Sequence, residues 1–285
     1  MNVSVVFVNW NANAALLGAL ASLPPDSTDM SLEVVVIDNG SRPPPSSRQL
    51  RACAGREVLL IANRSNLGLA AANNQGLAAT TGDLVLLANP DIELKPGALE
   101  ELVAAMGRHG RAAFTVPRLV HPDGSHQPSA GDLPTVRSAL MGTSWSKGGG
   151  GRMWWPEAEH RCERVVPRGA EACYLVRRRA VEDFGGQDPG FRLDWEGPEW
   201  FDRAGRAGWE AWLAPAAVVV HSGGASISLA GLRWVVQSHA GMYRYLAPRT
   251  PPAIRPLLTA TVGVRAVLKA VALAGGAPLY RRAQR

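Results

Sequence analysis

The first 110 residues alternate between short apolar runs and helix-forming segments, joined by short polar turns. The apolar runs are rich in Val, Ile and Leu without a polar/apolar alternation, which is typical of strands buried on both faces of a parallel sheet. We expect strands at 3–8, 33–37, 58–62 and 84–88, and helices at 14–22, 46–54, 69–80 and 96–109. This order predicts βαβ units, and therefore an α/β fold with a mostly parallel central sheet flanked by helices.

After residue 116 the alternation becomes less regular. We expect strands at 170–176, 209–213 and 217–220, and helices at 198–207, 232–246 and 256–273. The chain therefore divides into residues 1–116, residues 117–228 and a C-terminal helical extension, 229–285. No uninterrupted apolar run reaches the roughly 18 residues of a transmembrane helix, so we expect none.

The net charge of +6 is largely C-terminal, because the segment 244–285 holds eight basic and no acidic residues. Elsewhere the basic residues are scattered and no recognition motif is present, so we expect no nucleic-acid partner. Arg255, Arg265 and Lys269 share one arc of a helical wheel. This predicts a basic amphipathic helix, which either contacts anionic lipid or packs on the domain or on another subunit in a homodimer.

The three cysteines have neither disulfide-framework nor metal-ligand spacing. Their arrangement favours a reducing compartment. We therefore expect a cytoplasmic protein, with peripheral contact at the inner face of the plasma membrane if the C-terminal extension binds lipid.

Polar side chains follow four of the expected strands, and ligands of open α/β sheets bind beyond the carboxyl ends of the strands. These side chains are Asn9 and Asn11; Asp38, Asn39 and Ser41; Asn66; and Asn89 with Asp91. A hard cation such as Mg²⁺ takes one or two protein carboxylates plus substrate phosphates, so Asp91 alone can anchor one. For each residue ordinary turn or capping chemistry is the alternative.

Small residues at Gly68 and around Asn74 would let a backbone approach a diphosphate closely. The dinucleotide-binding fingerprint and the P-loop are both absent from the sequence, so it supports neither a nicotinamide-dependent enzyme nor a P-loop kinase.

Several strings resemble the family 2 glycosyltransferases, particularly their rhamnosyltransferase-like branch. They are VVFVNWN at 5–11, VVIDNGS at 35–41, NLG at 66–68, NQG at 74–76, LANPD at 87–91, FGG at 184–186 and VHSGGAS at 220–226. The resemblance covers about residues 3–226. It implies a GT-A fold, with a nucleotide-sugar-binding half at 1–116 and an acceptor-binding half at 117–228.

The resemblance also implies a nucleoside-diphosphate sugar donor, carrying dTDP or UDP, and a divalent cation, Mg²⁺ or Mn²⁺. Asp38 corresponds to the carboxylate that reads the pyrimidine, with Asn9 and Asn11 in the same pocket. The remaining donor-binding candidates are Asn39, Ser41, Asn66, Gly68 and Asn74. Asn89 and Asp91 lie at the D-x-D metal motif, with Asn in place of its first Asp, and His221 lies near the diphosphate as a third candidate ligand.

The sequence departs from the family at the catalytic base, because the aspartate usually assigned to this role aligns with Gly197. Glu196, Glu199 and Asp194 are the remaining candidates, in that order. Acids are also favoured at a helix N-terminus by the helix dipole, which is the alternative explanation for Glu196 and Glu199. The candidates for stacking on an acceptor sugar are tryptophans, which more often belong to a core: Trp154, Trp155, Trp195 and Trp200.

The function that fits these features is metal-dependent, inverting transfer of a hexose or deoxyhexose to a glycan, lipid-linked or small-molecule acceptor. Rhamnose from dTDP-rhamnose is one candidate donor. Because Gly197 replaces the base, a catalytically impaired protein that only binds nucleotide sugars is an alternative. A nucleotidyltransferase is another, although the glycine-rich basic loop usual in that class does not follow the first strand.

Overall fold

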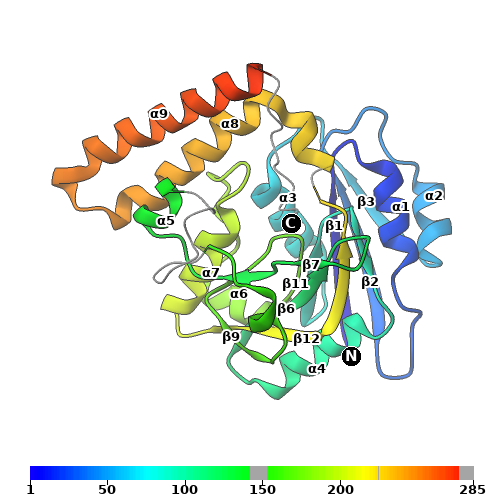
Figure 1. The fold of residues 1–285 in the computed structure, drawn as a ribbon. Coiled ribbons are helices and arrows are strands. Elements are labelled where there is room, and N and C mark those ends of the chain that lie inside the picture. The colour runs from blue at the N-terminus through cyan, green and yellow to red at the C-terminus, as the bar shows by residue number, and fades with distance from the viewer. Residues whose placement is uncertain (142–152, 224, 276–285) are drawn as a thin grey trace.

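The computed structural model describes residues 1–141, 153–223 and 225–275, and its centre is a ten-stranded mixed sheet (Figure 1). The main path through this sheet has the strand order β3-β2-β1-β4-β11-β6-β12-β5. The N-terminal strands pair in parallel: β1 (Asn2–Asn9) with β2 (Ser31–Asp38) and β4 (Leu84–Ala88), and β2 with β3 (Val58–Ala62). The four strands expected in this part of the sequence are confirmed.

The later strands extend the same sheet. β11 (Cys173–Arg177) runs antiparallel between β4 and β6 (Ala112–Val120), and β12 (Glu210–His221) runs parallel to β6 and antiparallel to β5 (Ile92–Leu94). The short strands β7 (His126–Gln127) and β9 (Arg164–Val166) pair with β6 and β12, while β8 (Ala130–Gly131) and β10 (Arg168–Gly169) form a separate pair.

Helices cover both faces of the sheet. α1 (Asn13–Ala21), α2 (Ser47–Ala54) and α4 (Ala98–Arg108) pack on one face, and α3 (Leu69–Ala79), α6 (Arg178–Phe184) and α7 (Glu196–Arg206) on the other. Successive side chains of β1 alternate between the two cores, with Phe7 on the first and Val6 on the second. This arrangement explains why the strands are apolar at nearly every position.

The strand β6 was not expected from the sequence, and it contains a proline, Pro117. Pro117 pairs with Ala214 at the point where the register of β12 shifts between Ala214 and Val218. Proline lacks a backbone N–H, and an irregular point in the ladder tolerates that loss. The same irregularity lies between the two expected strands at 209–213 and 217–220, which form the single strand β12.

The C-terminal helices α8 (Ala225–Leu246) and α9 (Arg255–Ala274) form a layer of their own, with α9 outermost (Figure 1). Short elements complete the described chain: α5 (Val136–Met141) and 3₁₀ turns at Glu157–His160, Ala247–Arg249 and Pro252–Ile254. Tyr245 of α8 and Leu258 of α9 share a small core with Trp195, the residue just before α7. The helix pair therefore packs on the turn that opens α7.

Of the two alternatives expected for the basic residues of α9, the structure shows packing on the domain. Arg265 and Lys269 are only partly exposed, and the Lys269 ammonium lies 4.0 Å from the centroid of the Trp234 ring on α8. Long basic side chains can pack inward in this way because their aliphatic stems are apolar and an aromatic face attracts the cation. The exposed face of α9 is apolar instead: Leu257, Val264, Val267, Leu268 and Val271 are each at least 59% exposed.

The segment Pro252–Ala274 is also long and apolar enough to cross a membrane, with a mean hydropathy of 1.7 and 11% of its most apolar stretch buried. This corrects the expectation that no such helix exists. Arg265 and Lys269 interrupt the apolar run without lowering its mean hydropathy below that of membrane helices.

Candidate active site

Asp91 and His221 face each other at one edge of the sheet. The turn after β4 carries Asp91, and His221 ends β12, which pairs there with Ile92 of β5. The His221 Nε2 atom lies 3.4 Å from the Asp91 Oδ1 atom, and His221 Nδ1 lies 3.1 Å from Gln127 Oε1. Gln127 thus orients the imidazole ring with its Nε2 atom toward the carboxylate.

A carboxylate oxygen and an imidazole nitrogen are both ligands that a divalent cation accepts. The side chains of Asp91 and His221 are 9% and 15% exposed, so they are shielded but reachable. Among the described residues no group of three His, Cys, Asp or Glu side chains could hold a metal ion. A cation between Asp91 and His221 would therefore need further oxygen ligands from a bound substrate or water. Asn89, two residues before Asp91, is partly exposed at the same edge.

The ends of β1 and β2 are joined by a buried hydrogen-bond network around Asp38. Its Oδ1 atom accepts a hydrogen bond from the Asn9 amide at 3.0 Å, and its Oδ2 atom accepts one from the Ser41 N–H at 3.2 Å. The Asn11 N–H donates to Ser41 Oγ at 2.8 Å. Asp38 and Asn9 are 1% and 0% exposed, whereas Asn11 is exposed. Asp38 and Asn9 therefore fix the loop, and Asn11 is the member open to a ligand.

A second network holds the loop before α3. Asn39 donates to Asn66 Oδ1 at 3.1 Å, and the same Asn66 atom accepts the Gly68 N–H at 2.9 Å. Gly68 has a φ of +93°, and a Cβ atom there would lie 2.8 Å from the carbonyl oxygen of Arg192. Glycine at position 68 is therefore required by the backbone itself.

The amide of Asn74, which was expected to bind the donor, is occupied by the backbone of Gln187 instead. Its amide donates to the Gln187 carbonyl at 2.7 Å, and its oxygen accepts the Gln187 N–H at 2.9 Å. Asn74 therefore ties α3 to the segment after α6.

Three of the four tryptophans expected to contact an acceptor are core residues instead. Trp200 is fully buried and donates from its indole N–H to the Gly185 carbonyl at 2.8 Å, while Trp155 and Trp195 are 6% and 7% exposed. Trp154 is partly exposed, but the Arg168 guanidinium lies 4.1 Å from the centroid of its ring. These indoles stabilise the fold, as buried aromatic side chains do.

Three acidic side chains cluster beside α7: Glu171, Asp194 and Glu196. Sequence reasoning missed Glu171, whose Oε1 atom accepts a hydrogen bond from the Gly197 N–H. Burial and, to a smaller extent, the nearby Asp194 carboxylate raise the pKa of Glu171 to about 7. Burial likewise raises the pKa of Asp194 and holds the pKa of Glu196 well above its ordinary value. The cluster thus keeps protons that exposed carboxylates lose near pH 4.

The first two candidates for the base do not suit that role. Glu196 is fully buried, and neither of its carboxylate oxygens has a hydrogen-bond partner in the structure. A carboxylate without partners in a buried place is strongly disfavoured, so Glu196 is held neutral. Glu199 makes two hydrogen bonds to Arg203, at 2.9 and 2.8 Å. Its carboxylate is therefore engaged in an ion pair. Arg203 also donates to the carbonyl of Phe184, the last residue of α6, so this pair links α7 to the end of α6.

Asp194, the third candidate, lies on a strained turn. Asp194 and Trp195 have φ angles of +58° and +71°, a region that L-residues rarely adopt. Each such residue costs on the order of 1–3 kcal/mol, so the surrounding packing must enforce the turn. Gly241 of α8 supplies part of that packing, since a Cβ atom there would lie 3.2 Å from the Trp195 indole and 3.4 Å from the Asp194 carbonyl oxygen.

The raised pKa of Glu171 leads to a prediction about stability. A carboxyl group whose pKa is higher in the folded than in the unfolded chain favours folding fully at low pH, and this contribution is lost as the pH rises from about 4.5 through 7. The Tm of Glu171→Gln should therefore rise relative to that of the wild type as the pH increases over this range. Differential scanning fluorimetry from pH 4.5 to 8.5 measures it, and a constant difference would contradict the assignment.

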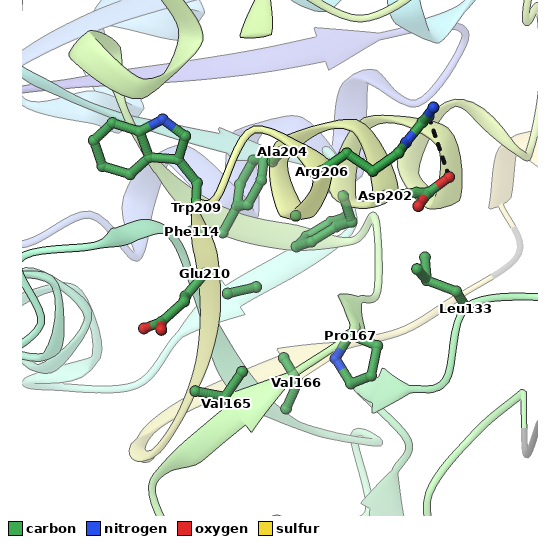
Figure 2. Close-up of a pocket in the computed structure, with 13 residues that line it drawn as sticks. Phe114, Leu133, Val165, Val166, Pro167, Asp202, Ala204, Arg206, Trp209 and Glu210 are labelled. Carbon is green, nitrogen blue, oxygen red and sulfur yellow. Dashed lines mark ion pairs between the residues drawn. The ribbon is translucent and has the colours of Figure 1, made fainter. Parts of the chain in front are cut away.

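A cavity of about 280 Å³ lies away from these residues, between α7, β9 and the start of β12 (Figure 2). Phe114, Pro167 and Trp209 are among its lining residues, and an ion pair of 3.3 Å joins Asp202 and Arg206 at its side. Glu210, which also lines it, begins β12, whereas His221 ends that strand, a separation of at most about 36 Å at ~3.3 Å per residue. This cavity is therefore separate from the candidate active site.

The chain is similar to proteins of one known family. The model of the family described as "Glycosyl transferase family 2" matches residues 4–185. An N-acetylglucosaminyl-diphospho-decaprenol L-rhamnosyltransferase of Mycobacterium tuberculosis, found in strains CDC 1551 and H37Rv, is 30% identical over 258 residues, which are 86% of this chain and 84% of the relative.

Two solved structures share the fold at lower identity. The mannosyltransferase PcManGT from Pyrobaculum calidifontis, in complex with GDP-Man and Mn²⁺, has a TM-score of 0.56 at 18% identity and covers 96% of this chain and 75% of its own. GalNAc-T7 with UDP, GalNAc and Mn²⁺ has a TM-score of 0.55 at 19% identity and covers 78% of this chain and 44% of its own. The expected GT-A fold is confirmed by these likenesses.

Proposed function

The chain belongs to glycosyl transferase family 2 and is a glycosyltransferase, and from this premise we propose that it transfers a deoxyhexose, L-rhamnose from dTDP-rhamnose, to a lipid-linked acceptor with inversion at the anomeric carbon. The observation that carries this proposal is the meeting of Asp91 and His221, 3.4 Å apart, at the edge where β1, β2 and β4 end. The choice of sugar and acceptor follows the name of the mycobacterial relative, which shares most of its length with this chain.

We place the diphosphate of the donor at this edge, with a divalent cation held by Asp91 and His221 and with Asn89 beside it. When bound, the cation would offset the negative charge that develops on the leaving diphosphate. An imidazole ligand favours Mn²⁺ over Mg²⁺, because Mg²⁺ prefers oxygen. The exposed Asn11 and the loop fixed by Asp38 and Ser41 form the wall on which the nucleotide base would lie.

Inversion requires the acceptor hydroxyl to attack the anomeric carbon from the side opposite the diphosphate. A carboxylate must take the hydroxyl proton, and no residue of the protein needs to bond to the sugar. The acid cluster, Glu171, Asp194 and Glu196, is the group of carboxyl side chains that we place in this role. It adjoins the end of β4, since Ala172 accepts the Asn89 N–H at 2.8 Å.

A transfer assay tests the proposal. The purified chain is incubated with Mn²⁺, a short-chain prenyl-diphospho-N-acetylglucosamine and dTDP-rhamnose, with UDP-N-acetylglucosamine and GDP-mannose as comparison donors. We expect dTDP-rhamnose to be the preferred donor and NMR of the product to show the inverted anomer. Binding of dTDP-rhamnose without transfer or hydrolysis would instead support a nucleotide-sugar-binding protein. Release of pyrophosphate from dTTP and a sugar 1-phosphate would support a nucleotidyltransferase.

The apolar face of α9 gives the lipid-linked acceptor a place to enter. We place this face on a lipid bilayer, because the exposed positions of α9 carry no charged side chain and the segment matches a membrane helix in length and hydropathy. α9 packs on α8, and Ser238 of α8 hydrogen-bonds to Asp194. A bilayer against α9 would therefore lie beside the helix pair that covers the acid cluster, which suits an acceptor anchored by its lipid.

Vesicle flotation tests the membrane contact. The double variant Leu268→Glu/Val271→Glu places two charges on the exposed face, and we expect it to lose most of the membrane-bound fraction seen for the wild type. Leu59→Glu is the matched control, because Leu59 is 50% exposed on β3, far along the sheet. Equal flotation of the double variant would contradict the proposal. A wild-type dimer that dissociates in the double variant, measured by ultracentrifugation, would assign the face to a second copy instead.

A further inference from the structure

We propose that Glu171 is the catalytic base of this enzyme, and that its carboxylate takes in space the place that an acidic side chain at position 197 would occupy. This inference rests on the proposed function, since it names the group that accepts the proton of the acceptor hydroxyl. Glu171 is not among the three residues, Glu196, Glu199 and Asp194, that the sequence offers as the base.

The geometry around Gly197 carries the inference. A Cβ atom built on Gly197 would lie 2.5 Å from Glu171 Cδ, a distance at which two carbon atoms overlap. The Gly197 N–H donates to Glu171 Oε1, so the two residues are in direct contact. Gly197 has a negative φ, and its helical position does not itself call for glycine. The absence of a side chain at 197 is thus explained by the Glu171 carboxylate that fills its place.

Glu171 differs from Glu196 in being open to a substrate. It is partly exposed, whereas Glu196 is fully buried. The Gly197 N–H engages Oε1 and leaves Oε2 to accept a proton. Asp194 is partly exposed as well, but it is held by Ser238 and lies on the turn that α8 covers.

Glu171 is placed beside the donor edge by the pairing of two strands. β11 runs antiparallel to β4, so the residues just before β11 lie next to the residues just after β4. The hydrogen bond from the Asn89 N–H to the Ala172 carbonyl, 2.8 Å long, fixes this neighbourhood. Glu171 is therefore next in the chain to Ala172, the residue that contacts the turn carrying Asn89 and Asp91.

In the proposed reaction, Glu171 accepts the proton of the acceptor hydroxyl and the donor diphosphate is the leaving group. The acceptor O–H bond breaks and its proton moves to Glu171 Oε2. The oxygen electron pair forms the new bond to the anomeric carbon, and the bond from that carbon to the diphosphate oxygen breaks with its electrons on the diphosphate. Glu171 then loses the proton to solvent. Its pKa of about 7, raised by burial and by the Asp194 carboxylate, suits a base that works near neutral pH.

Two variants and one control test the assignment. We expect Glu171→Gln to bind dTDP with the thermal shift of the wild type but to transfer sugar about 10²- to 10⁴-fold more slowly, the usual loss when a general base is removed. Glu182→Gln is the control, because Glu182 is exposed on α6, and it should transfer at the wild-type rate. The double variant Glu171→Ala/Gly197→Asp returns a carboxylate to the same place, so we expect it to recover at least tenfold over Glu171→Gln.

The outcomes separate the inference from the proposed function. If the wild type transfers sugar and Glu171→Gln is within threefold of it, Glu171 is not the base and the proposed function stands. Failure of the double variant to exceed Glu171→Gln, with both variants binding dTDP normally, also overturns the inference, because a carboxylate at that place would then be insufficient. A wild-type chain that transfers no sugar from any donor overturns the proposed function and the inference together.

Discussion

Replacing Asp91 by Asn is expected to lower the transfer rate on the order of 100-fold or more at a fixed Mn²⁺ concentration, while the fold is kept. Asn retains the size of the side chain and its place beside His221, but it removes the negative charge that a cation would bind. A bound cation contributes several kcal/mol of transition-state stabilisation, and each 1.36 kcal/mol is a tenfold change in rate. Initial rates at increasing Mn²⁺ concentrations measure the effect, and raising Mn²⁺ should restore part of the loss.

Glu93→Gln is the control for this prediction. Glu93 lies two residues from Asp91, on β5, with its side chain 54% exposed and paired with Lys95 at 2.7 Å. Its replacement changes the same charge at nearly the same place without touching His221. Equal rates for Asp91→Asn and the wild type at low Mn²⁺ would show that Asp91 does not bind the cation.

Trp200→Ala is expected to destabilise the fold by about 3–5 kcal/mol, the range for removing a large aromatic side chain from a core. Trp200 is fully buried, and its ring centroid lies 5.0 Å from that of Phe114. Its removal would also leave the Gly185 carbonyl without the indole N–H that donates to it. Urea unfolding followed by circular dichroism measures the loss.

Trp209→Ala provides the comparison for Trp200. Trp209, the residue just before β12, is partly exposed and donates to Asp183 at 3.1 Å, so its replacement should destabilise the fold clearly less. If Trp200→Ala kept the stability of the wild type and raised the KM for the acceptor, Trp200 would contact the acceptor as first expected from the sequence.

The N-terminal half of the fold was predictable because its signals are local. The runs that form β1 to β4 are apolar at nearly every position, and proline or glycine separates several of the elements, as at Pro24 and Gly55. β6 was not predictable in the same way. Pro117 argues against a central strand, and only the register shift of β12 opposite to it explains how the strand accommodates proline.

The proposed metal ligand Asp91 and the proposed base Glu171 differ in the same way in how far the sequence predicts them. Asp91 lies three residues after the end of β4, so its position at the ligand-binding edge could be expected from the sequence. Glu171 precedes its strand, and it reaches that edge only because β11 runs antiparallel to β4, a pairing that no local pattern encodes. The inward packing of Lys269 depends likewise on Trp234, which lies on a different helix.

Electron paramagnetic resonance of Mn²⁺ with the purified chain and dTDP tests the central claim most directly, because it reports the ligands of the cation. If Asp91 and His221 hold the cation on the donor diphosphate, the spectrum should show coupling to phosphorus and to one imidazole nitrogen. The nitrogen coupling should disappear in His221→Asn, and the affinity for Mn²⁺ should fall in Asp91→Asn. Phosphorus coupling without a nitrogen coupling, unchanged in both variants, would contradict the account and place the cation elsewhere.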